Sequence, residues 1–205
     1  NLSGYNQPAS ITFYECSSID IINSVFKDNV RGDDFLNFFK SKKIVIKNSF
    51  FENILNDAID SDFSDISILN SQFNNIGNDA VDGSGSNIDI DNSRFYNVYD
   101  KGVSAGERSS FKISNSSFAF NEIAVVSKDA SNVILKANKL NNNKIDFSSF
   151  VKKQYFGPSQ TTFQNTKIDN YLIENDSKII GKDSILFSSD VESKLYGNLY
   201  GRASD

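Results

Sequence analysis

The chain has 205 residues, 39% of them hydrophobic, which is enough for one domain with a buried core. Its formal net charge of −5 argues against a nucleic-acid partner, because binding to a phosphate backbone depends on an excess of Lys and Arg. No apolar run approaches the roughly 20 residues of a membrane span. A single cysteine, Cys16, excludes an intrachain disulfide, and the lack of His excludes Ser-His and Cys-His catalysis.

A unit of about 22 residues repeats along most of the chain, which is typical of stacked-repeat proteins. Each unit begins with two apolar residues separated by one other residue, continues with a Phe, and reaches one more apolar residue after a polar turn. The opening pairs are, in chain order, Ile19/Ile21, Ile44/Ile46, Ile66/Ile68, Ile88/Ile90, Phe111/Ile113 and Val133/Leu135. The Phe position is held by Phe26, Phe51, Phe73, Phe95, Phe118 and Leu140, and the last apolar position by Ile11, Leu36, Ile59, Val81, Val103, Val125 and Phe147. This alternation predicts three short strands in each unit.

Such a unit cannot bury its own apolar side chains, so the units must stack. Coils that pair at about 4.8 Å place like side chains over like and make a continuous core. The sequence therefore predicts an all-β fold, a single-stranded right-handed parallel β-helix of about six to seven coils over residues 1–150. The period ends after Phe147, so residues 151–205 are expected to form an irregular β cap over the open end. A leucine-rich repeat would need a Leu-x-x-Leu-x-Leu pattern, which is absent, and a propeller would need a period of about 40.

An Asn recurs at one turn of the unit. It is found at Asn23, Asn48, Asn70, Asn92 and Asn115. Stacked amides can bond to one another along a solenoid, so we expect a structural Asn ladder at a buried corner.

Acidic residues gather at the outward positions of the central coils. Because Ile59 must point inward, alternation sends Ala58, Asp60 and Asp62 outward and leaves Asp57 at the turn before the strand. The next coil has Asp79 and Asp82 at the positions of Asp57 and Asp60. Two carboxylates on adjacent coils, about 5 Å apart, repel by roughly 3 kcal/mol at an effective dielectric constant of about 20. A bound ligand or a proton-transfer role would explain this cost, and a solvated structural surface is the other interpretation.

Two aromatic residues extend the outward column that contains Asp62. Tyr14 and Phe39 would form an aromatic platform beside carboxylates, a combination that suits sugar faces and sugar hydroxyls. The predicted ligand-binding residues are Tyr14, Phe39, Asp57, Asp60, Asp62, Asp79, Asp82, Lys101, Glu107 and Arg108.

Catalysis is an open alternative. Asp60 with Asp82, or Asp57 with Asp79, would give the two carboxyl groups of a glycosidase at about the retaining distance. In a lyase, Lys101, Arg108 or Lys128 would act as the base or neutralise a substrate carboxylate. Glycines near Lys101 suggest close approach of a ligand or of a neighbouring loop, although a structural ion pair of Glu107 with Arg108 or Lys128 is the favoured interpretation of this segment.

No cofactor is predicted. Asp60, Asp62 and Asp82 offer oxygen ligands suited to Ca²⁺, but they do not form the Asp-x-Asp-x-Asp-Gly loop of a calcium site.

Several motifs support a family resemblance. They are NDAIDSDFS (56–64), NDAVDGSGS (78–86), DKGVSAGERS (100–109), VSKDASNV (126–133) and KKQYFGP (152–158). Residues 9–150 resemble the right-handed parallel β-helix superfamily, which is pectate-lyase-like in architecture. More narrowly, they resemble β-helix regions of bacterial surface proteins, some of which are joined to CotH-kinase-like domains.

The resemblance implies a secreted or envelope-associated bacterial module, fused to or associated with another domain, with a polysaccharide or cell-surface glycan as partner. The chain lacks the Asp-Pro-His-Glu motif of mannuronan epimerases and the Asn-Thr-Asp, Gly-Asp-Asp, Ser-His-Gly and Arg-Ile-Lys set of polygalacturonases. No catalytic residue is therefore carried over. We predict a non-catalytic carbohydrate- or surface-interaction module. The alternatives are a polysaccharide lyase or glycoside hydrolase that acts on an acidic polysaccharide, and a structural spacer.

Overall fold

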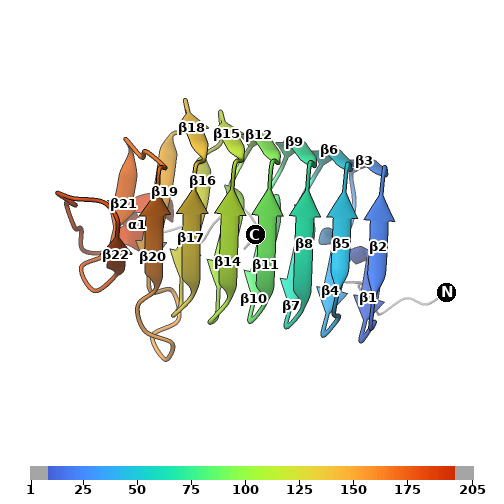
Figure 1. Cartoon of the computed structure of the whole chain (residues 1–205), viewed down its shortest axis with the longest axis horizontal. Coiled ribbons are helices and arrows are strands. Elements are labelled where there is room, and N and C mark those ends of the chain that lie inside the picture. Colours follow the sequence, from blue (N-terminus) through green and yellow to red (C-terminus); the bar gives the residue numbers. More distant parts are fainter. Residues whose placement is uncertain (1–8, 197–205) are drawn as a thin grey trace.

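The computed structural model describes residues 9–196, and within them the chain winds into a parallel β-solenoid (Figure 1). Its strands form three parallel sheets that run the length of the molecule, here called sheets A, B and C. The first eight residues of the predicted coil region, and residues 197–205 of the predicted cap, lie outside the described part.

Each coil gives one strand to each sheet for most of the length of the stack. Sheet A consists, in spatial order, of β1 (Ala9–Tyr14), β4 (Asp34–Phe39), β7 (Asp57–Asp62), β10 (Val81–Ser84), β13 (Lys101–Gly106), β16 (Ile123–Lys128), β19 (Ile145–Phe150) and β21 (Tyr171–Ile173). Sheet B consists of β2 (Ile19–Ile22), β5 (Ile44–Lys47), β8 (Asp65–Leu69), β11 (Asn87–Asp91), β14 (Ser110–Ser114), β17 (Asn132–Lys136), β20 (Gln160–Gln164) and β22 (Lys178–Ile180). Sheet C consists of β3 (Val25–Asn29), β6 (Phe50–Ile54), β9 (Gln72–Ile76), β12 (Arg94–Val98), β15 (Ser117–Ala119) and β18 (Lys139–Asn141).

The predicted all-β parallel β-helix is confirmed, but it has about eight coils instead of six to seven. The difference arises after residue 150, where β20, β21 and β22 continue sheets A and B while sheet C ends at β18. A short helix, α1 (Val191–Tyr196), then packs Val191 against Ile123, Val126 and Phe150 on the outer side of sheet A. Within residues 9–196, no helix has the length and apolar character to cross a membrane.

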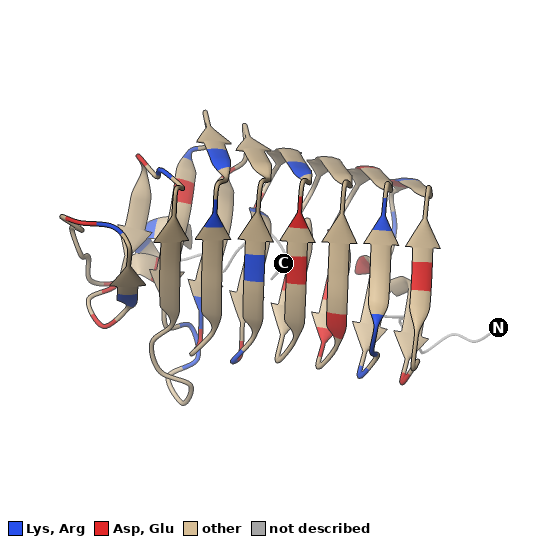
Figure 2. Ribbon diagram, in the orientation of Figure 1, with Lys and Arg blue, Asp and Glu red and all other residues tan. Residues whose placement is uncertain are grey.

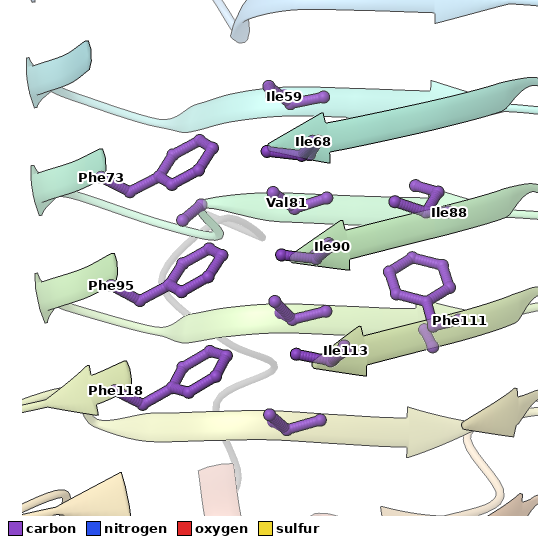
Figure 3. Close-up of a cluster of buried hydrophobic side chains, with 14 of the residues drawn as sticks. Ile59, Ile68, Phe73, Val81, Ile88, Ile90, Phe95, Phe111, Ile113 and Phe118 are labelled. Carbon is purple, nitrogen blue, oxygen red and sulfur yellow. The ribbon is translucent and has the colours of Figure 1, made fainter. Parts of the chain in front are cut away.

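The interior consists of vertical columns of like side chains, as the repeat predicts (Figure 3). Ile59 pairs with Val81, and Val81 with Val103, in the register of sheet A. The Phe column is a ring stack, in which neighbouring centroids from Phe26 through Phe51, Phe73, Phe95 and Phe118 lie 4.9, 4.7, 4.8 and 4.5 Å apart. Each aromatic pair of this kind adds about 0.5–1.5 kcal/mol beyond the area that it buries.

One inward position was predicted wrongly. Ala58 belongs to the buried core instead of the outer face. In the register of sheet A, Asp34 pairs with Asp57 and Leu36 with Ile59, and no residue of β4 pairs with Ala58. The strand is therefore irregular at its start, so strict alternation fails at this position.

The Asn ladder is confirmed for four coils. Asn48 donates to Asn23 at 3.1 Å, Asn70 to Asn48 at 3.3 Å and Asn92 to Asn70 at 2.8 Å, whereas Asn115 donates to Asp91 at 2.7 Å. These amides are exposed, so the expected buried corner is wrong. All five residues have φ near +50°, the left-handed conformation that Asn tolerates better than most residues.

Buried polar ladders inside the coil went unpredicted. The backbone N–H of Ser49 donates to the hydroxyl of Ser71 at 3.2 Å, and that of Ser71 to Ser93 at 3.2 Å. A second column does the same, with Ser41 N to Ser64 Oγ at 2.8 Å and Ser64 N to Ser86 Oγ at 3.0 Å. These hydroxyls satisfy N–H groups that turn into the core where the strands end.

Candidate functional site

The outer side of sheet A carries the predicted row of polar side chains. Its register places Asn37, Asp60, Asp82 and Ser104 at one position on four consecutive coils. Asn37 Nδ2 donates to Asp60 Oδ2 at 2.6 Å. Strands in a sheet lie about 4.8 Å apart, so the carboxyl groups of Asp60 and Asp82 are immediate neighbours, as the sequence predicted.

These two neighbouring carboxyls differ in protonation. Burial, reinforced by the charge of Asp82, raises the pKa of Asp60 to about 8. Burial alone would raise the pKa of Asp82 as well, but the Lys128 ammonium, 4.0 Å from Asp82 Oδ1, holds it below its ordinary value. At neutral pH Asp60 is therefore a neutral carboxylic acid beside an ionised Asp82. This avoids the repulsion that two adjacent carboxylates would suffer.

Lys128 reaches Asp82 by crossing the intervening strand β13. A Cβ added at Gly106 of that strand would lie 2.9 Å from Lys128 Cε, so the missing side chain makes room for the lysine. At Gly102 an added Cβ would lie 2.6 Å from the carbonyl oxygen of Ala124. The protein itself thus fills the space beside both glycines.

Asp79 and Lys101 form a buried ion cluster. Lys101 Nζ lies 3.1 Å from Asp79 Oδ1 and 2.5 Å from Asp100 Oδ2, and Lys101 is only 8% exposed. Burial disfavours its charge, yet the two carboxylates raise the pKa of Lys101 well above the ordinary value. The ring of Tyr196 in α1 lies over the ammonium, 5.5 Å from Nζ to the ring centroid. A lysine that is held charged and covered is suited to a structural role.

Asp57 sits at the start of the same face but is engaged by its neighbours. Its Oδ1 accepts hydrogen bonds from Asn78 Nδ2 at 2.6 Å and from the backbone N–H of Asp79 at 2.8 Å. Burial raises the pKa of Asp57 well above its ordinary value, and the charge of Asp79 adds to the effect.

The predicted partners of Glu107 are wrong. Glu107 accepts a hydrogen bond from Ser84 Oγ at 2.5 Å and forms an ion pair with Lys153, a residue of the KKQYFGP segment. Arg108 lies over the ring of Phe156 in the same segment, 5.5 Å from the guanidinium carbon to the ring centroid. The long-range fold of residues 152–158 onto this turn decides both contacts, and no local spacing indicates it.

Aromatic residues gather at the N-terminal end of the face. Tyr14 and Phe39 stack with centroids 5.5 Å apart and planes 7° from parallel, and Phe63 meets Phe39 edge-on at 6.1 Å. Because one face of Phe39 is taken by Tyr14, the rings most available to a ligand are Tyr14, 60% exposed, and Phe63, 53% exposed. Phe63 was not predicted. Gly85, one coil later, is the feature of the sequence that could have indicated the position of the Phe63 ring, because a Cβ at Gly85 would lie 2.7 Å from that ring.

The structure therefore brings most of the predicted residues to one face and separates others from it. Asn37, Asp60, Asp62, Asp82 and the aromatic cluster share the outer side of sheet A. Lys101 is enclosed beneath α1, and Arg108 packs against the cap. Within residues 9–196, no three His, Cys, Asp or Glu residues are grouped so as to hold a metal ion, so the Ca²⁺ prediction at Asp60, Asp62 and Asp82 gains no support.

Charges on the opposite side of the coil are mixed. Sheet B faces the viewer in Figure 2, where the acidic bands of β11 lie beside a basic band of β14. In the register of that sheet Asp89 is the partner of Lys112. The outer side of sheet A differs from this pattern, because it combines the raised pKa of Asp60 with the exposed rings of Tyr14 and Phe63.

Comparison with known proteins defines the class. The family model described as a right-handed β-helix region matches residues 9–175, so the chain belongs to that family. The narrower resemblance to surface proteins with CotH-kinase-like domains is not confirmed by this match. No curated protein matches the chain.

Solved structures give only distant likenesses. One structure of QnrB1, a plasmid-mediated fluoroquinolone resistance protein, has 11% identity and a TM-score of 0.26 over 90% of this chain and 95% of its own. A second QnrB1 structure has 12% identity and a TM-score of 0.21, over 91% of this chain and 93% of its own. HetL, a pentapeptide repeat protein of the cyanobacterium Nostoc sp., has 10% identity and a TM-score of 0.11, over 68% of this chain and 86% of its own. Likenesses at this level say nothing about the function of this chain.

Proposed function

We propose that this β-helix is a non-catalytic module that binds carbohydrate along the outer side of sheet A. One observation carries the proposal. On consecutive coils this face presents the Asn37 amide, the neutral Asp60 carboxyl and the ionised Asp82 carboxylate, beside the exposed rings of Tyr14 and Phe63.

The groups on this face match the chemistry of a sugar. A sugar hydroxyl both donates and accepts hydrogen bonds, and an amide or a protonated carboxyl does the same. The apolar faces of sugar rings pack on aromatic side chains. The Asp82 carboxylate is paired with Lys128 and Asp60 is neutral, so in the described part of the chain this row of polar side chains offers a uronate no unpaired cation and suits neutral glycans better than uronate polymers. A glycan-binding role fits a secreted or envelope-associated bacterial protein.

A glycan array of neutral and uronate-containing oligosaccharides tests the proposal. We expect binding to neutral glycans that falls at least about tenfold, equal to about 1.4 kcal/mol, in Phe63→Ser and Asp60→Ala. Asp89→Ala, an exposed change on the outer side of sheet B, is the matched control and leaves binding unchanged. Circular dichroism verifies that each variant is folded. An array without binding, or binding that both sheet A variants retain in full, overturns the proposal.

Cleavage of a glycosidic bond is a second candidate, favoured by a different observation. Asp60 has a raised pKa and Asp82 a lowered one, the division expected of an acid and a nucleophile. Their places on adjacent coils are near the separation of about 5–5.5 Å in retaining enzymes. New reducing ends from a glycan that the protein binds, lost in Asp82→Asn, would establish this activity, whereas binding without new ends supports the non-catalytic module.

A further inference from the structure

A second surface departs from the repeat at the corner between sheets C and A. Along this corner a second amide ladder runs through consecutive coils, with Asn53 donating to Asp28 at 3.0 Å, Asn75 to Asn53 at 2.7 Å and Asn97 to Asn75 at 3.2 Å. Each of these residues has φ between +53° and +57°. The next coil has Phe120 at the ladder position, and Asn142 resumes the pattern one coil further.

Phe120 is an unfavourable residue for this position. It has φ +59°, and a left-handed conformation costs an ordinary L-residue roughly 1–2 kcal/mol. Asn and Asp tolerate this conformation best, and neighbouring coils have them. Burial offsets little of the cost, because Phe120 is 52% exposed and, among residues 9–196, its ring makes one aromatic contact, edge-on with Tyr96 at 5.3 Å between centroids. A costly conformation at an exposed aromatic residue points to a function outside the folding of the chain.

A cavity of about 310 Å³, open to solvent on one side, lies beside the interruption of the ladder. Two columns of three residues line its sides, one formed by Asn97, Phe120 and Asn142 and the other by Tyr99, Glu122 and Lys144, with Val98 and Asn121 between them. No residue in the described part of the chain donates to Asn97 Oδ1. In a continuous ladder, Asn97 Oδ1 would accept a hydrogen bond from the next coil. Within residues 9–196 it has no such donor and is free to accept one at the cavity.

We propose that this cavity binds one neutral hexopyranose unit, at a site separate from the outer side of sheet A. Tyr99 is 45% exposed, so its ring and that of Phe120 are available to the apolar face of a sugar. Asn97 Nδ2 donates to Asn75 Oδ1 and to the Tyr99 hydroxyl, so Asn97 offers its Oδ1 as an acceptor, whereas the amide of Asn142 supplies donors and an acceptor for hydroxyls. Glu122 is paired with Lys144, so the two charges cancel and neither a uronate nor a cationic sugar is favoured. The volume is at the lower end of small-molecule sites, about 300–1,000 Å³, and suits a single ring.

Substitution of Phe120 by Asn separates binding from stability. The variant would resume the ladder between Asn97 and Asn142 and remove the strained aromatic residue. We therefore expect Phe120→Asn to unfold at the same or a higher urea concentration than the parent protein, and to lose at least about tenfold in affinity for the sugar. Tyr99→Ser is expected to lose the same affinity. Leu55→Ser is the matched control, because Leu55 holds the place of Tyr99 two coils earlier, is 54% exposed, and does not line the cavity.

The probes are glucose, galactose, mannose and N-acetylglucosamine, and binding to residues 1–205 is measured by saturation-transfer NMR and titration. Binding of at least one of them, reduced in Phe120→Asn and Tyr99→Ser and retained in Leu55→Ser, supports the site. Absence of binding by all four, or equal binding in both cavity variants, overturns it. Asp60→Ala leaves this binding intact, so failure at the outer side of sheet A and failure at this cavity are distinguishable.

Discussion

The ring stack inside the coil and the outer side of sheet A follow opposite rules, although both repeat at the coil spacing. In the stack each Phe contacts its own copies, with centroids 4.5–4.9 Å apart. On the outer side the same register places Asn37, Asp60, Asp82 and Ser104 on four consecutive coils. Only the two central coils have the same residue type, Asp, at this position. One surface is uniform and the other varies from coil to coil.

The difference shows what each surface is in contact with. A buried side chain in a solenoid has its own copies as main neighbours, so the residue that packs best is retained in each coil. Outward side chains have solvent, the cap or a ligand as neighbours, and these differ along the stack. A position that repeats is thus a packing position, and a position that varies next to regular neighbours is a candidate for function. Phe120 in its amide ladder is the sharpest example.

The largest expected effect tests the uniform surface. Phe95→Ala removes a fully buried ring from the middle of the stack, and we expect the free energy of unfolding to fall by about 3–5 kcal/mol. The adjacent Tyr96 is 50% exposed, so Tyr96→Ala should change it by less than about 1 kcal/mol. Urea denaturation of both variants measures the two values. Equal losses would show that the stack contributes no more than the exposed ring.

Sequence alone predicts the parts of this molecule that depend on repetition. The period places Ile59 next to Val81 and Phe73 next to Phe95 in adjacent coils. When units of equal length stack, residues one period apart have few other positions relative to each other. The Asn ladder follows in the same way. Asp60 and Asp82 were predicted side by side for the same reason.

What escapes prediction depends on contacts between different parts of the chain. Lys153 reaches Glu107 from 46 positions along the sequence, and Lys128 reaches Asp82 across an intervening coil. Ala58 turns inward because the strand is irregular at its start. The cavity beside Phe120 lies where one coil departs from its neighbours, and a search for repeats discards such a departure as a mismatch.

The next effect tests the variable surface through pH. Burial raises the pKa of Asp60 to about 8 and that of Asp34 to about 7, whereas unfolded carboxyls ionise near about pH 4. Between those limits the native state binds more protons than the unfolded state, so stability falls as the pH rises. We expect Asp60 alone to lower the free energy of unfolding by about 3 kcal/mol from pH 5 to pH 8, and Asp34 to add to this decrease.

A variant identifies the source of that slope. Asp60→Asn removes one of the carboxyls whose pKa is raised and should flatten the profile in part, because Asp34, Asp57 and Asp79 also have raised pKa values. Asp89→Asn on sheet B should leave the profile unchanged. Asp82 does not contribute in this range, because its lowered pKa places its stability loss in more acidic solution. Urea midpoints between pH 5 and pH 8 measure the slope. A profile that rises with pH in the parent protein would contradict a protonated Asp60.

The smallest expected effect distinguishes a glycine of the core from one of the outer side. An added Cβ at Gly83 would lie 2.6 Å from the buried Phe111 ring, so Gly83→Ala should cost about 1–3 kcal/mol by overpacking. At Gly106 the added atom meets only the flexible end of Lys128, so Gly106→Ala should cost less than about 1 kcal/mol. Its main consequence is electrostatic. Lys128 moves away from Asp82, and the pKa of Asp82, followed by carboxyl ¹³C NMR, rises. If the pKa stays where it was, the charge of Asp82 is held by something other than this lysine, and the neutral–ionised pairing with Asp60 requires another cause.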